Sequence, residues 1–274
     1  MLIDTHCHLD AAEFNADRDK VAVEAAQAGV RMLVIPAVEV ANFAHVMALS
    51  RQHPHCSYAL GMHPMYVQNA KPSDLKILHD LVKDTLNIEN KLVAIGEIGL
   101  DFFVSQRNEI ESREIQEYFF VEQLKIAKQF DLPVILHVRR AVDEVLKHLR
   151  RAKVRGGIAH AFNGSPQQAQ EFIKLGFKLG FGGAMTYTRA LKIRELAKAL
   201  PLEAIVLETD SPDIPPEWIG SKGRNSPKEL LKIAEVLSAL RGVSLTQIIE
   251  MTGKNSIDIL PKLATLCTPL EVLH

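Results

Sequence analysis

The chain has 274 residues, of which 47% are apolar and 24% are charged, and its formal net charge is −1. A chain of this length can bury a large core, either as one big α/β domain or as two ordinary ones. The near-neutral charge excludes a broad basic surface of the kind that binds nucleic acid, although a local positive patch stays possible.

Short apolar runs rich in β-branched residues recur along the chain, and each is typical of a buried parallel strand. In chain order these eight runs are 2–4, 30–37, 56–62, 92–99, 132–138, 156–162, 177–183 and 204–210. Helical segments are expected between them, for example over 111–130. The alternation predicts an α/β fold, one (β/α)₈ TIM barrel spanning residues 1–274 as a single domain. A doubly wound open sheet is the main structural alternative.

Several helix boundaries also have local signals. Ser165 and Ser226 each precede a proline and are followed three residues later by Gln or Glu, which predicts a capped helix start. Gly29 and Gly176 stand where helices are expected to end, as glycine commonly does.

Cellular location is suggested by what the sequence lacks. Three widely spaced cysteines, Cys7, Cys56 and Cys267, indicate neither a disulfide framework nor a paired-cysteine metal site. The start MLIDTHCHLD does not resemble a signal peptide, and no apolar run is long enough to cross a membrane. We therefore expect a soluble, cytoplasmic protein without membrane association or an obligate protein partner.

Metal-binding side chains occur where the predicted strands end. In a barrel the active site lies at the carboxyl ends of the strands. Six of the eight runs carry or lead into such a residue: His6 and His8, His63, Glu97, His137, His160 and Asp210. One polar residue on an apolar strand can be satisfied by backbone, but a charge or imidazole there is costly unless it is paired or coordinated. Their recurrence at one end predicts a shared metal centre.

The ligand set predicts two cations. His6 and His8 lie two residues apart, so in an extended segment both face the same side while Cys7 faces the other. Four histidines and two carboxylates exceed the three protein ligands of a catalytic zinc. We assign His6, His8 and Asp210 to one cation, His137 and His160 to the other, and Glu97 as the bridge. Such ligands suit Zn²⁺, Mn²⁺ or Fe²⁺, and Mg²⁺ stays possible.

These motifs resemble those of the TatD-related metal-dependent hydrolases within the amidohydrolase-like barrels, with the strongest likeness to the bacterial YjjV branch. The matching stretches run in order along nearly the whole chain: IDTHCHLD, GMHP, GEIGLD, LPVILHVRRA, AHAFNGS, LGFGG, LETDSPDIP and GRNSP. The resemblance implies a (β/α)₈ barrel with divalent cations at His6, His8, Glu97, His137, His160 and Asp210. It also implies hydrolysis, typically as a deoxyribonuclease or phosphodiesterase. Val138 and Arg140 depart from the family pattern after the fifth strand, which concerns local substrate contacts.

Three further residues are predicted to bind substrate. His63, in GMHP, is expected to donate to a substrate phosphate, and the alternative is a loop histidine that holds a turn. Arg139 and Arg224 are each predicted to clamp a phosphate, and the alternative for both is an exposed surface arginine. Glu208 and Asp101 are candidates for orienting the metal ligands.

The sequence favours a divalent-metal-dependent phosphodiesterase or deoxyribonuclease that uses a metal-activated water, with Glu97 and Asp210 as catalytic residues. One alternative is a metal-dependent amidase, lactonase or deacylase, because the same pair of cations serves those reactions. A second is a non-catalytic metal- or nucleic-acid-binding protein. The near-neutral charge favours single strands, ends or small phosphodiesters over a long duplex.

Overall fold

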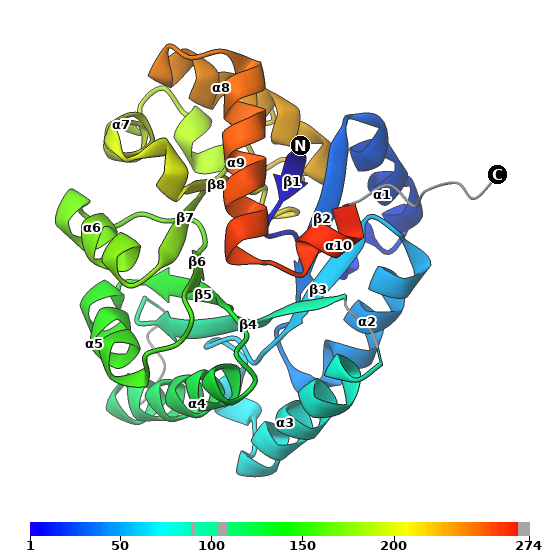
Figure 1. The fold of residues 1–274 in the computed structure, drawn as a ribbon, viewed down its shortest axis with the longest axis vertical. Coiled ribbons are helices and arrows are strands. Elements are labelled where there is room, and N and C mark those ends of the chain that lie inside the picture. Colours follow the sequence, from blue (N-terminus) through cyan, green and yellow to red (C-terminus); the bar gives the residue numbers. More distant parts are fainter. Residues whose placement is uncertain (89–90, 104–108, 268–274) are drawn as a thin grey trace.

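A computed structural model describes residues 1–88, 91–103 and 109–267 (Figure 1). In this part of the chain, eight parallel strands form one sheet whose order follows the sequence. The strands are β1 (Leu2–Asp4), β2 (Val30–Pro36), β3 (Cys56–Leu60), β4 (Leu92–Asp101), β5 (Val134–Arg139), β6 (Gly157–Ala159), β7 (Phe177–Phe181) and β8 (Ile205–Leu207). All eight predicted strands are confirmed.

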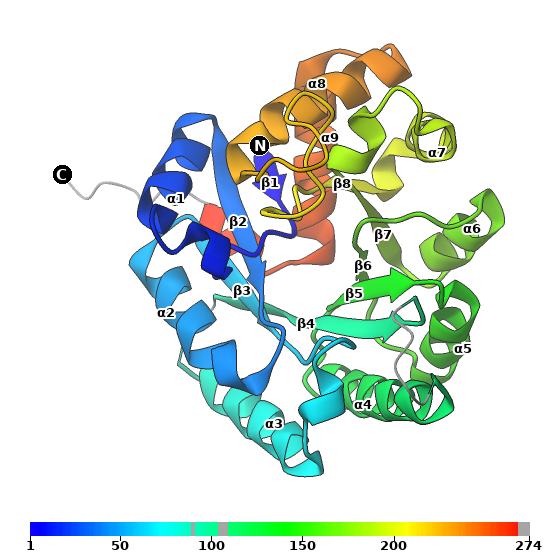
Figure 2. The same ribbon diagram turned by 180° about the vertical axis from the view of Figure 1, so that it is seen from behind.

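Helices surround the sheet in both views (Figures 1 and 2). They are α1 (Arg18–Gln27), α2 (Phe43–Gln52), α3 (Pro72–Leu86), α4 (Glu109–Gln129), α5 (Val142–Ala152), α6 (Pro166–Lys174), α7 (Leu191–Ala199), α8 (Leu230–Arg241), α9 (Leu245–Ile259) and α10 (Leu263–Cys267). The helix expected over 111–130 is α4. Among the described residues, none of the helices combines the length and the apolar character that crossing a bilayer requires.

The predicted helix boundaries are mostly confirmed. The Ser165 hydroxyl accepts the backbone N–H of Gln168 at 3.1 Å and caps α6. Gly29 and Gly176 follow α1 and α6 with φ of 89° and 83°, which glycine adopts without strain. The start expected at Ser226 is different, because a 3₁₀ turn over Pro227–Glu229 precedes α8 and Ser226 makes no side-chain capping bond.

Backbone hydrogen bonds join the segments that directly follow β1 and β8. The Asp210 N–H donates to the His6 carbonyl at 2.9 Å, and the His8 N–H donates to the Ser211 carbonyl at 2.8 Å. Because sheet order follows chain order and its two ends are bonded in this way, the fold is a (β/α)₈ barrel. The doubly wound open sheet is thereby excluded.

The barrel interior is closed at its amino end by apolar side chains. Inward-facing strand residues, including Ile3, Val93 and Ile135, form one buried cluster with Leu260 and Leu263 from the end of α9 and from α10. Figure 1 shows α9 and α10 lying across this side of the barrel. The outer strand faces pack against the ring of helices in a second cluster. The polar candidate ligands therefore lie at the other, carboxyl end of the barrel.

Candidate metal centre

The carboxylate of Glu97, on β4, lies at the middle of a cluster of imidazoles and is 1% exposed. Its Oε2 lies 3.1 Å from His6 Nε2 and 3.4 Å from His8 Nε2. Its Oε1 lies 2.9 Å from His160 Nε2 and 3.1 Å from His137 Nδ1. The two oxygens of one side chain thus face two separate groups of histidines, as a carboxylate that bridges two cations must.

Asp210 lies on the same side of the cluster as His6 and His8. Its Oδ1 is 3.4 Å from His6 Nε2 and 3.6 Å from His8 Nε2. The backbone at Asp210, three residues after the end of β8, is left-handed with φ of 56°. The His6 ring also stacks on the His160 ring with centroids 3.9 Å apart, so both halves of the cluster are in contact.

The distances fit ligands that share a divalent cation. Bonds of about 2.0–2.1 Å at tetrahedral angles place neighbouring ligand atoms roughly 3.3 Å apart. The His6 and His8 Nε2 atoms are 3.1 Å apart, and the carboxylate oxygens lie 3.1–3.6 Å from them. Among the described residues, three overlapping groups at this end could hold a cation: His6, His8 and Glu97; His6, His160 and Asp210; and His63, Glu97 and His137. Imidazole and carboxylate donors suit Zn²⁺, Mn²⁺ or Fe²⁺.

Burial and the charges of neighbouring side chains shift the pKa values of the carboxylate and the imidazoles in the cluster. Burial raises the pKa of Glu97, but the positive charge of His160 and its neighbours outweighs burial and holds this pKa well below its usual range. Burial lowers the pKa of His6 well below its ordinary value. Burial also lowers the pKa of His8, but hydrogen bonding and charge from Glu97 outweigh it and raise the pKa to about 9. The raised pKa of His8 and the lowered pKa of Glu97 both favour an ionised carboxylate beside a protonated imidazole. A cation bound by these ligands would displace such protons.

Asp101 orients one of the ring nitrogens. Its Oδ2 lies 3.0 Å from His137 Nε2, which leaves His137 Nδ1 facing Glu97. The Gln116 amide holds Asp101 by bonding its backbone N–H and its carbonyl, at 2.8 and 3.1 Å. A carboxylate behind a histidine fixes the tautomer and raises the basicity of the other nitrogen. Asp101 therefore occupies the position that an orienting residue requires.

His63 lies inside the cluster rather than at its rim. Its Nε2 is 3.3 Å from Glu97 Oε1, and the residue is only 7% exposed. Its Nδ1 accepts the backbone N–H of Met65 at 3.1 Å. A neutral ring with an accepting Nδ1 carries its proton on Nε2, so His63 faces the centre as a hydrogen-bond donor.

Known proteins with this fold share much of the sequence. Residues 3–261 match the family model described as TatD related DNase. This chain belongs to the TatD family. It is 44% identical over 241 residues to the uncharacterized metal-dependent hydrolase YjjV of Escherichia coli, covering 87% of this chain and 90% of that protein. It is 35% identical over 271 residues to human deoxyribonuclease TATDN3, covering 97% and 96%.

Solved structures of the TatD family and beyond have the same barrel. The crystal structure of Escherichia coli YjjV superposes with a TM-score of 0.88 at 39% identity, covering 95% of this chain and 98% of that one. An uncharacterized amidohydrolase from Saccharomyces cerevisiae has a TM-score of 0.82 at 22% identity, covering 94% and 99%. At that identity the likeness shows the fold alone.

The two arginines predicted to bind substrate in this TatD-family chain have different surroundings. Arg139, at the end of β5, is half exposed, with its Nη1 4.0 Å from Asp101 Oδ2 and its guanidinium over the Phe103 ring. Arg224 bonds the Asp17 carboxylate with both terminal nitrogens, at 2.8 and 2.6 Å. Because a guanidinium in a bidentate pair has fewer donors left, a phosphate role has more geometric support at Arg139 than at Arg224.

Asp4 lies beside the centre, and the sequence motifs predict no role for it. It is fully buried at the end of β1. Its Oδ1 accepts the N–H of Thr209 at 3.0 Å, and its Oδ2 accepts the Thr209 hydroxyl at 2.6 Å. The segments that carry His6 and Asp210 are therefore tied together beneath the centre. The only signal in the sequence is an acid that ends an apolar run.

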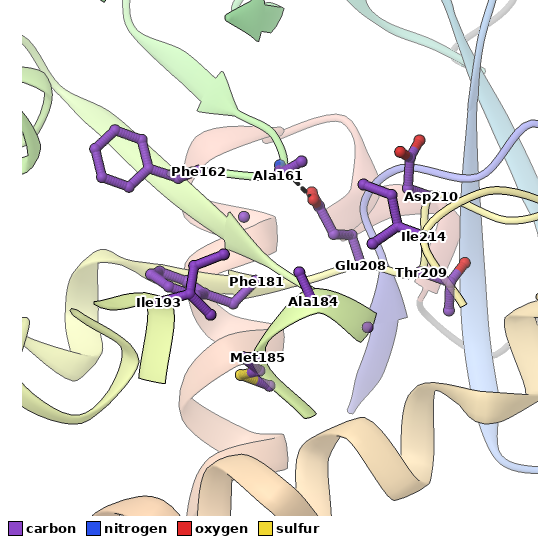
Figure 3. A pocket seen from close by; sticks show the side chains of 13 residues that line it. Ala161, Phe162, Phe181, Ala184, Met185, Ile193, Glu208, Thr209, Asp210 and Ile214 are labelled. Atoms are coloured by element: carbon purple, nitrogen blue, oxygen red, sulfur yellow. Dashed lines mark hydrogen bonds between the residues drawn. The ribbon is translucent and has the colours of Figure 1, made fainter. Parts of the chain in front are cut away.

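Glu208 supports the turn that carries His160. Its Oε1 accepts the backbone N–H of Ala161 and lies 3.8 Å from His160 Nδ1. Figure 3 shows this bond at the edge of a small pocket beside Asp210, with apolar walls from Phe162, Phe181, Met185, Ile193 and Ile214. A Cβ at Gly180 would lie 2.1 Å from Glu208 Oε2, so a side chain at this position would displace the carboxylate.

Proposed function

We propose that the chain is a divalent-metal-dependent hydrolase that cleaves phosphodiester bonds at a centre of two cations. The observation that carries the proposal is the Glu97 carboxylate, whose two oxygens face separate histidine groups at 2.9–3.4 Å. Family membership supports it, since one relative is named a metal-dependent hydrolase and another a deoxyribonuclease. Single-stranded or terminal nucleic acid and small phosphodiesters are the proposed substrates.

The contacts of Glu97 and Asp210 support the following assignment of ligands. His6, His8 and Asp210 would hold one cation, His137 and His160 the other, and Glu97 would bridge them. Bound cations would supply Lewis acidity and a water of lowered pKa. Asp210 Oδ1 faces the His6 and His8 side of the centre and would accept the proton of the attacking water.

The donors around the centre favour an anionic substrate. His63 would donate from Nε2 to a phosphoryl oxygen, and half-exposed Arg139 would bind the same group from the rim. A neutral amide or lactone has no negative charge for Arg139 to neutralise. This distinction separates a phosphodiesterase from an amidase, lactonase or deacylase built on the same ligands.

Metal reconstitution tests the proposal. The protein is stripped with a chelator, reloaded with Zn²⁺, Mn²⁺, Fe²⁺ or Mg²⁺ separately, and assayed on phosphodiester, phosphomonoester, lactone and amide substrates. We expect metal-dependent turnover that is highest on phosphodiesters, with two cations bound per chain. His6→Ala and Asp210→Asn serve as inactive controls. Turnover that survives in both variants, or a preference for lactones or amides, would contradict the proposal, as would tight metal binding without turnover on any substrate.

A further inference from the structure

Two consecutive arginines share one aromatic ring at the rim of the centre. The Arg139 guanidinium carbon lies 3.7 Å from the centroid of the Phe103 ring, and that of Arg140 lies 4.4 Å from the same centroid. Phe103 is 43% exposed, and both arginines are exposed. Cation–π contact of this kind holds a guanidinium in one orientation while its N–H groups still reach solvent.

The backbone explains how neighbours reach the same ring. Consecutive residues of a strand point to opposite sides, so two adjacent arginines would ordinarily diverge. Arg139 is the last residue of β5, and Arg140 follows with φ of 54° in the left-handed region. This conformation is strained for a residue with a side chain. It breaks the alternation and allows both guanidinium groups to lie over Phe103.

The ring is anchored directly to the centre. Asp101 Oδ1 accepts the backbone N–H of Phe103 at 2.9 Å, while Oδ2 of the same carboxylate lies 3.0 Å from His137 Nε2. One buried side chain therefore connects a candidate metal ligand to the residue that carries the arginines. The arginine pair consequently lies next to the candidate metal centre.

The described acids near Arg140 have other partners. Among the side chains that the structure describes, no carboxylate forms an ion pair with it. The two acids that begin α5 face other partners: Asp143 accepts the Gln168 amide at 2.8 Å, and Glu144 pairs with Lys147 and His148. The positive charge of Arg140 is therefore available to a ligand.

We propose that Arg140, held beside Arg139 on the Phe103 ring, forms a second anion subsite that binds a phosphate adjacent to the scissile phosphodiester, whose own phosphoryl group Arg139 contacts. The subsite rests on the proposed function for the scissile group, and it selects short oligonucleotides over diesters with a single phosphate. The ligand of this subsite is a phosphate group of the nucleotide next to the scissile bond.

Dinucleotides that differ by one phosphate test the subsite. The metal-loaded enzyme is assayed on dTpdT and on its 5′- and 3′-phosphorylated forms. We expect kcat/KM for one phosphorylated form to exceed that for dTpdT by about tenfold, because charge-assisted contacts to phosphate are strong. Arg140→Ala should remove most of this preference, and Arg140→Lys should restore part of it. Phe103→Leu should weaken it, because the guanidinium groups lose the ring that orients them.

A matched control and a binding measurement separate the two proposals. Arg155 precedes β6 and pairs with Asp131, which precedes β5, so both lie at the amino end of the barrel, away from the centre. Arg155→Ala should therefore leave the preference unchanged. In chelator, the metal-free protein should bind a fluorescent tetrathymidylate several-fold more weakly after Arg140→Ala. Equal preference in wild type and Arg140→Ala, with equal binding, would overturn the subsite. Intact binding differences without any diester hydrolysis would instead overturn the proposed function.

Discussion

The two ends of the barrel are built from the same strands, but apolar side chains are buried at one end and carboxylates and imidazoles at the other. At the amino end, Ile3 and Val93 pack against Leu260 and Leu263, and each is 2% exposed or less. At the carboxyl end of the same β4 strand, Glu97 is equally buried among histidines. The apolar end gains free energy from burial, whereas the polar end requires partners for every charge. Stability and chemistry are therefore carried by opposite ends of one sheet.

Backbone strain is also present at the polar end. Arg140, Ala161 and Asp210 have φ of 54°, 43° and 56°, and they follow β5, β6 and β8. A left-handed residue with a side chain costs roughly 1–3 kcal/mol and persists where surrounding contacts determine it. The packed amino end supplies the stability that tolerates such turns.

The largest expected effect on turnover comes from Glu97→Gln. The amide keeps the shape of the side chain but loses the charge that two histidine groups face. We expect kcat/KM to fall by about a thousandfold or more, with reduced metal content, since electrostatic stabilisation of this kind is usually the largest catalytic contribution. Steady-state hydrolysis and metal analysis measure both quantities. Wild-type turnover and full metal content in this variant would contradict the role of Glu97 and the assignment of the chemistry to the polar end.

A smaller loss is expected from Asp101→Asn, which leaves all six proposed metal ligands in place. Asparagine cannot hold His137 in the same tautomer, so kcat/KM or metal affinity should fall by about 10–100-fold. Asp84→Asn, the same change at an exposed position of α3, is the control. If both variants behave alike in metal titration and kinetics, Asp101 has no orienting role.

The smallest effect on turnover is expected at the amino end. Leu263→Ala creates a cavity at a fully buried position and should lower the free energy of unfolding by about 2–5 kcal/mol. Urea denaturation measures this loss, and Leu191→Ala, at a residue that is 75% exposed, should change stability by less than about 0.5 kcal/mol. Turnover per folded molecule should stay at the wild-type value. A fall in turnover without a loss of stability would show that the two ends are coupled.

Much of the fold could be predicted because its signals are local. Eight apolar runs mark eight strands, and parallel strands that alternate with helices bring their carboxyl ends to one face. The convergence of His6, Glu97 and Asp210 follows from that topology. The surroundings of His63 and Arg224 could not be predicted, since a loop residue has no periodicity to indicate its neighbours. The structure places His63 against Glu97 and pairs Arg224 with Asp17.

The sequence by itself determined the strand order, the helix ends at Ser165, Gly29 and Gly176, and the set of residues that gathers at one end. Only the tertiary structure decided how the two oxygens of Glu97 divide between histidine groups, and that Asp4 bonds Thr209 across 205 positions of the chain. It also decided that Arg140 joins Arg139 on Phe103. The physical reason is that apolar periodicity encodes which side of a strand is buried. Contacts between distant side chains depend instead on strand register and on single left-handed turns.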